Sequence, residues 1–189
     1  MTHEQPDLRR RTLLQAAGLL ALGQVAPPSS HARAAEPAPG KSGEFDFLAG
    51  SWTISHRRLK AAGGQDWDEF NGEATCWTIL GGVGSVEELR IPARGFSGMG
   101  LRLLDVEKSL WSDYWVNGKS GVLTTPGMTG RFEGGVGTFV ADDMDGARPI
   151  KVRGVWDRIT PRSCRWHQAV SYDGGKTWEG NWFMDWVRV

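Results

Sequence analysis

Few side chains in this 189-residue chain have the chemistry for acid–base catalysis, and His56 and His167 are the clearest candidates. Imidazole changes charge near neutral pH, so a His beside a carboxylate can act as a general base. We expect His56 to face inward, where Asp113 or Glu87 would be its partner. No Ser/His/Asp order, carboxylate pair or phosphate-binding loop accompanies these residues. The sequence therefore assigns no catalytic residue.

The two cysteines, Cys76 and Cys164, are the other reactive groups. They fall on strands that we expect to be second and ninth in order, which are not neighbours in an up-and-down barrel. A disulfide between them would have to cross the interior. We therefore predict two free, buried thiols. No C-x-x-C or Cys/His spacing predicts a metal site.

The elements that must position these side chains are short strands separated by glycine-containing turns such as Asn117-Gly118 and Asp173-Gly174. The pattern predicts an all-β protein: a closed antiparallel up-and-down β-barrel of about ten strands, whose closure removes exposed strand edges. The expected strands are Trp52–Leu59, Glu69–Leu80, Ser85–Ile91, Gly100–Val106, Leu110–Val116, Gly121–Thr125, Arg131–Phe132 with Gly137–Ala141, Ile150–Asp157, Cys164–Tyr172 and Trp178–Arg188.

The two ends of the expected barrel carry residues suited to closing it. Gly50-Ser51-Trp52 opens the first strand, and Arg188 lies two positions from the end of the last. We expect Trp52 to plug the bottom and the guanidinium of Arg188 to stack over its ring and bond nearby carbonyls.

Strand parity selects the side chains that line the interior, because alternate residues point to opposite faces. His167 is expected to face outward and Gln168 inward. The chain has ten tryptophans, which can brace the barrel or line an aromatic pocket. The candidate lining residues are His56, Tyr114, Trp115, Arg153, Gln168, Trp182 and Trp186.

The N-terminal region has the pattern of a cleaved export signal. Arg9-Arg10-Arg11 precedes an apolar run, and Ala32-Arg33-Ala34 resembles a small-residue cleavage site of a twin-arginine-type leader. We expect a signal peptide over residues 1–34, a flexible linker over 35–43 and one barrel domain over 44–189, located in the periplasm or secreted. The mature chain keeps 18 basic and 20 acidic residues, a balance that predicts neither nucleic-acid nor membrane binding.

The chain resembles the DUF1579 family of uncharacterised bacterial proteins. The resemblance rests on Phe45-Asp46-Phe47-Leu48-Ala49-Gly50-Ser51-Trp52 and on two C-terminal blocks, Arg165 to Ser171 and Asp173 to Met184. It implies a calycin-like barrel related to lipocalins, fatty-acid-binding proteins and nitrobindin-like haem barrels. The family brings no established reaction.

Three functions follow as hypotheses. The first is an exported monomer or dimer that binds a small apolar or aromatic molecule in its lumen, without a cofactor. The second is a nitrobindin-like haem protein, for which the resemblance favours His167 as the axial ligand and strand parity favours His56. The third is an enzyme acting on a lumen-bound substrate, with His56 as acid or base.

Overall fold

The computed structural model describes residues 38–189 as an all-β domain of ten strands. The predicted signal peptide, residues 1–34, lies outside the described residues. Three short 3-10 turns accompany the strands: η1 (Asp46–Leu48), η2 (Leu80–Gly82) and η3 (Pro92–Arg94). The strands are β1 (Gly50–Leu59), β2 (Trp67–Ile79), β3 (Gly84–Ile91), β4 (Phe96–Asp105), β5 (Leu110–Asn117), β6 (Met128–Glu133), β7 (Val136–Asp145), β8 (Arg148–Asp157), β9 (Ser163–Ser171) and β10 (Glu179–Arg188).

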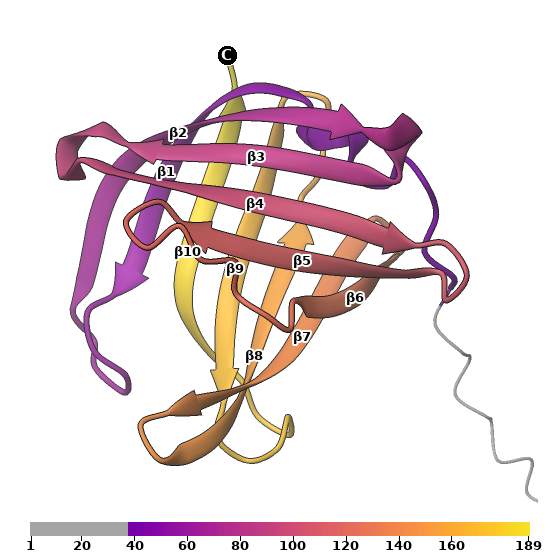
Figure 1. Cartoon of the computed structure of the whole chain (residues 1–189). Coiled ribbons are helices and arrows are strands. Elements are labelled where there is room, and N and C mark those ends of the chain that lie inside the picture. Colours follow the sequence, from indigo (N-terminus) through magenta and orange to yellow (C-terminus); the bar gives the residue numbers. More distant parts are fainter. Residues whose placement is uncertain (1–37) are drawn as a thin grey trace, which may run out of the picture. The chain divides into compact units, whose positions relative to one another are not determined.

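The strands form a closed antiparallel barrel in which each strand pairs with its neighbours in sequence and β1 pairs with β10. The closing pair runs from Trp52↔Arg188 to Arg58↔Trp182. In Figure 1, β2–β5 cross in front of β8–β10 at a steep angle, so the barrel has two opposing walls. The predicted fold class is confirmed.

Two of the predicted strand assignments were wrong. Residues 121–125 form part of the loop between β5 and β6, with one isolated bridge between Val116 and Leu123. The stretch predicted as one interrupted strand is instead the hairpin of β6 and β7, which turns at Gly134 and Gly135. Both glycines have positive φ, 57° and 80°, which suits a tight hairpin turn. These two errors offset each other, so the predicted strand number is still ten.

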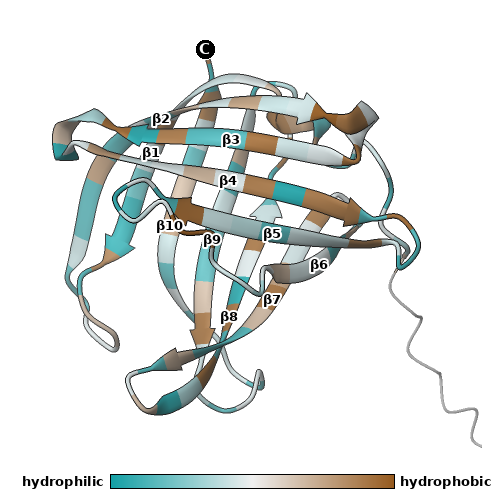
Figure 2. Ribbon diagram, in the orientation of Figure 1, coloured by the Kyte–Doolittle hydropathy of each residue, from teal (hydrophilic) through white to brown (hydrophobic). Residues whose placement is uncertain are grey.

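Alternation along the strands separates core from surface. In β1, Trp52, Ile54 and His56 are buried while Ser51, Thr53 and Ser55 are exposed. Figure 2 shows the same alternation of hydrophobic and hydrophilic positions along the strands.

A segment before β1 plugs the base of the barrel. Phe45 and Leu48 are fully buried, and the Phe45 ring packs edge-on against Trp111 and Phe132. Part of the predicted linker belongs to this plug, since the Gly40 N–H donates to the Ser109 carbonyl at 2.8 Å. The base is therefore sealed by an aromatic cluster in which the segment before β1 packs against β5 and β6.

Arg188 fastens this plug to the closing strand pair. Its guanidinium lies 4.2 Å from the centroid of the Trp52 ring. Nη1 and Nη2 donate to the carbonyls of Ala49 and Phe47, both at 2.6 Å, and Nε donates to that of Pro161 at 2.9 Å. The predicted stack of Trp52 and Arg188 is present, with every nitrogen of the guanidinium bonded.

Cys76 and Cys164 are free and buried, as predicted. Burial raises the pKa of each thiol to about 12. Both groups are therefore neutral and behave as small apolar side chains.

Candidate functional site

The barrel encloses a cavity of about 420 Å³, within the size range of small-molecule pockets. Residues of β3–β10 and of the β5–β6 loop surround it. Five of the ten tryptophans line this cavity: Trp115, Trp156, Trp166, Trp182 and Trp186. Other apolar residues of the wall are Leu89, Pro126, Met128, Ala141, Val152 and Met184.

Five of the seven predicted lining residues border the cavity: Tyr114, Trp115, Gln168, Trp182 and Trp186. The Gln168 amide nitrogen donates to the Asn181 side chain at 3.1 Å, which orients the amide at the cavity wall.

Arg153 lies on the outer surface of the barrel rather than in the lumen. Its neighbours in β8, Val152 and Gly154, occupy the opposite face, and Val152 lines the cavity. The Arg153 guanidinium lies 4.3 Å from the centroid of the Trp178 ring. The prediction of Arg153 as a lining residue was wrong because the pairing of β8 with β9 puts its odd-numbered residues outside.

His56 points inward but is packed into the wall beside the cavity. Its exposed fraction is 2%, its ring stacks on Phe70 at 4.5 Å, and its Nδ1 accepts the indole N–H of Trp182 at 3.3 Å. Burial, followed by repulsion from Arg94, lowers the pKa of His56 to about 4. His56 is therefore neutral at physiological pH, and none of its observed partners is a carboxylate.

The expected pairing of His56 with Asp113 or Glu87 is wrong, because both carboxylates are near Arg102 instead. His167 lies on the outer face, as parity predicted, between the cavity-lining residues Trp166 and Gln168. It stacks on Phe183, with ring centroids 5.8 Å apart. Neither imidazole borders the cavity. The cavity wall therefore has no His side chain that could be the axial ligand of a haem in this lumen.

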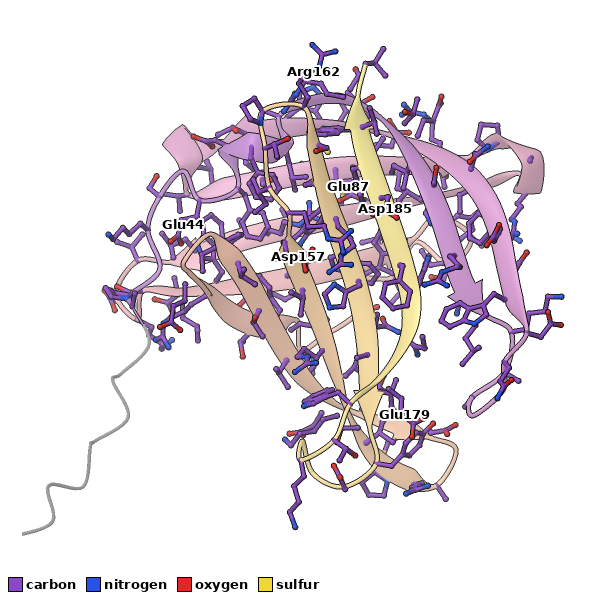
Figure 3. All side chains as sticks on the ribbon, turned by 180° about the vertical axis from the view of Figure 1, so that it is seen from behind. Glu44, Glu87, Asp157, Arg162, Glu179 and Asp185 are labelled. Atoms are coloured by element: carbon purple, nitrogen blue, oxygen red, sulfur yellow. The ribbon has the colours of Figure 1, made fainter. Side chains whose placement is uncertain are left out.

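The polar part of the cavity wall is a row of three charged side chains on β3, β4 and β5. The Glu87 carboxylate accepts a hydrogen bond from Nη2 of Arg102, and Asp113 Oδ1 lies 3.5 Å from Nε of Arg102. The side-chain exposures of Glu87, Arg102 and Asp113 are 3%, 5% and 15%. Figure 3, viewed from the β8–β10 side, places Glu87 on the far wall, whereas Asp157 and Asp185 lie on the near strands.

The row contains two carboxylates and one guanidinium. Burial raises the pKa of Asp113 to about 6; Glu87 adds to this rise and Arg102 opposes it. Burial also disfavours the charge on Arg102, but Asp113 and Glu87 more than offset that effect and raise its pKa. The guanidinium therefore stays charged, while Asp113 titrates near neutrality.

Glycines on β4 make room for this row. A Cβ atom on Gly100 would lie 2.9 Å from Nη2 of Arg102 and 3.2 Å from Glu87 Oε2. A Cβ atom on Gly98 would lie 2.2 Å from the Trp115 ring. Sequence reasoning missed Arg102 because Leu101 and Leu103 alternate with it and suggest the opposite inward face. Gly98-x-Gly100-x-Arg102 is the signal that favours the observed face.

Several buried donors deep in the cavity wall have no hydrogen-bond partner among residues 38–189: Nε and Nη1 of Arg102 and the indole nitrogens of Trp156 and Trp186. These atoms have almost no accessible surface. At the exposed end of the cavity, Asp143 of β7 is on the cavity face, whereas the side chain of Asp142 points outward and pairs with Lys151 at 2.6 Å.

The least-paired part of the wall is between β5 and β6. These strands share only three paired positions, from Trp111↔Gly130 to Asp113↔Met128, against seven between β1 and β10. The loop that follows β5 contributes Thr124, Thr125, Pro126 and Gly127 to the cavity wall.

No protein-family model matches the sequence, and no curated protein matches it. The resemblance to the DUF1579 family stays a prediction. Within residues 38–189, no helix is long and apolar enough to span a membrane. In the same part of the chain, no group of three or more His, Cys, Asp or Glu side chains is placed to hold a metal ion.

Proposed function

We propose that this protein is an exported, calycin-like barrel that binds a small apolar or aromatic molecule in its lumen, in the periplasm or outside the cell. The observation that carries the proposal is the cavity of about 420 Å³ with five tryptophans in its wall. Aromatic walls bury flat ligands well and orient them through edge and face contacts.

The energetics of such a site favour modest affinity. A ligand of two fused rings that buries about 300 Å² of apolar surface gains roughly 7 kcal/mol from leaving water. Part of this gain is lost to immobilising the ligand. We therefore expect dissociation constants of about 100 μM for well-fitting apolar compounds, unless polar contacts add to the affinity.

Access to the lumen is proposed through the wall between β5 and β6. Its three paired positions are the fewest of any adjacent strands in the barrel. Loops and weakly paired strands open at low free-energy cost. The loop of residues 118–127 can then move without disrupting the contacts at the base, where β1 pairs with β10 and Arg188 bonds the segment before β1.

Native mass spectrometry of the protein purified from an exporting host tests the proposed function. We expect an additional non-covalent mass that is lost on mild activation and that is reduced in a Trp182→Ala variant. Trp77→Ala is the matched control, since Trp77 is 46% exposed and does not border the cavity. If the protein carries no ligand and also binds none of a panel of naphthalene-sized compounds, the proposed function is wrong.

A further inference from the structure

The charge of the cavity lining is strongly one-sided. Four charged side chains lie on the cavity face of the strands: the carboxylates of Glu87, Asp113 and Asp143 and the guanidinium of Arg102. Asp143 lies near the exposed end of the cavity, and Glu87 and Asp113 are deep in the wall. The lining therefore has an excess of negative charge where a ligand would lie.

The deep carboxylates are the more informative pair. Buried charges in folded proteins are normally compensated by opposite charge. One guanidinium serves both Glu87 and Asp113, and Glu87 accepts a hydrogen bond from it. Asp113 is only within ion-pair distance of it, at 3.5 Å, and makes no side-chain hydrogen bond within the described residues. Asp113 thus has an acceptor available and one negative charge not balanced within the row.

The neighbouring walls suit a positive group. Trp115, Trp166 and Trp182 border the same cavity and are only partly buried, so their rings have exposed surface. An organic cation over an aromatic face gains up to about 2 kcal/mol when it is desolvated. The Trp182 ring already has one such contact, with the Arg58 guanidinium 4.6 Å from its centroid.

We propose that the lumen ligand is an organic cation: an apolar or aromatic amine whose ammonium group binds at Asp113 while its body lies among the tryptophans. This inference rests on the proposed function and specifies its ligand class. Asp143 at the exposed end of the cavity attracts such a cation. The ammonium supplies the charge that the row of Glu87, Arg102 and Asp113 lacks.

A carboxylate ligand fits this lining poorly. Its charge would add to two buried carboxylates that share one guanidinium. The unpartnered donors of the wall, Nε and Nη1 of Arg102 and the indole nitrogens of Trp156 and Trp186, have almost no accessible surface with which to meet an anion. The accessible polar group deep in the cavity is the Asp113 carboxylate, with 15% side-chain exposure.

Three compounds of nearly equal shape test the proposal by isothermal titration calorimetry at pH 7.5. They are 2-(aminomethyl)naphthalene, which is a cation, 2-ethylnaphthalene, which is neutral, and 2-naphthylacetate, which is an anion. We expect the amine to bind at least about tenfold more tightly than the ethyl compound, and the anion most weakly. Below pH 6 the preference for the amine should shrink, because Asp113 becomes protonated.

Two variants test whether the preference for the amine depends on Asp113. Asp113→Asn keeps the side-chain size and removes the charge, so the ratio of the affinities for the amine and for 2-ethylnaphthalene should fall about tenfold. Asp157→Asn is the matched control, since Asp157 pairs with Arg165 away from the cavity. Circular dichroism and urea unfolding show whether each variant is folded before its titration.

The outcomes separate the two proposals. Equal binding of the amine and the ethyl compound by the wild type, or tightest binding of the anion, overturns the inference and leaves the proposed function in place. A preference for the amine that survives intact in a folded Asp113→Asn protein also overturns it. If none of the three compounds binds, the proposed function and the inference both fail.

Discussion

Among the guanidinium groups that lie over tryptophan rings in this barrel, those of Arg188 and Arg102 have sharply different surroundings. Arg188 at the base is 4.2 Å from the Trp52 centroid and donates from all three nitrogens to backbone carbonyls. Arg102 in the cavity wall is 5.2 Å from the Trp156 centroid and lies between two carboxylates, with Nη1 unpartnered within residues 38–189. A group whose donors are all satisfied has no remaining capacity for a ligand. A row with unbalanced charge retains that capacity, so we expect the base to contribute to stability and the cavity wall to binding.

The largest expected effect comes from removing the cavity guanidinium. Arg102→Met leaves Glu87 and Asp113 buried without a cation, and breaking a buried ion pair in this way costs about 3–5 kcal/mol. Urea unfolding at pH 7.5 measures the loss. The double variant Glu87→Gln/Arg102→Met removes one carboxylate together with the cation and should recover at least half of it. A double variant as unstable as the single one would contradict the role of charge balance in this row.

A smaller loss of stability is expected when the guanidinium at the base is removed. Arg188→Met leaves the carbonyls of Phe47, Ala49 and Pro161 without their donor and should lower the free energy of unfolding by about 2–3 kcal/mol. Arg94→Met is the control, because the Arg94–Asp68 pair is solvent-exposed and contributes under about 1 kcal/mol. Affinity for 2-ethylnaphthalene, measured on folded protein, should not change in Arg188→Met. A weakened affinity would mean that the base and the cavity are not separate in function.

His56 is intermediate between the fully bonded Arg188 and the partly unpartnered Arg102. Its Nδ1 accepts a hydrogen bond, while Nε2 has no partner in the described part of the chain. The pKa of His56 is about 4 in the folded protein and near 6.5 in the unfolded chain. Between pH 4 and pH 6.5, His56 is therefore protonated in the unfolded chain but neutral in the folded protein. Stability is therefore lost as the pH falls from 6.5 towards 4, by about 2 kcal/mol at pH 5.

His56→Gln should remove this loss. The change in unfolding free energy between pH 7 and pH 5, followed by urea titration, should be about 2 kcal/mol less unfavourable than in the wild type. Asp113 has the opposite sign, because its raised pKa favours the folded state as the pH falls. Its contribution is present in both proteins and cancels in the comparison. The same pH dependence in both proteins would show that His56 is not kept neutral by burial.

The sequence alone predicted the base well. Glycine turns and two-residue alternation predicted a closed barrel, and the Trp52–Arg188 contact followed from residues at the two ends of the sheet. The plug formed by Phe45 and Leu48 was not predicted as such, because a short irregular segment has no periodicity that reveals what it packs against.

The cavity wall was predicted only in part. On β10 the tryptophans share one face of the strand, so the side chains of Trp182 and Trp186 were correctly predicted to face the interior. On β4 the sequence does not decide which face is inward. The apolar residues Leu101 and Leu103 suggest one face, but the face that is inside carries Gly98, Gly100 and Arg102. Register with β3 and β5 decides this, and it brings Arg102 to Glu87 and Asp113. A pairing across three strands is not encoded in the periodicity of any one of them.

The indole region of a ¹H–¹⁵N correlation spectrum tests the central claim, lumen binding, most directly. The ten tryptophans divide into five that line the cavity and five that do not, and assignment by single Trp→Phe variants gives each signal its residue. On titration with 2-(aminomethyl)naphthalene, we expect saturable shifts for Trp115, Trp166 and Trp182, smaller ones for Trp156 and Trp186, and none for Trp52, Trp67, Trp77, Trp111 and Trp178. Shifts confined to the second group would contradict binding in the lumen.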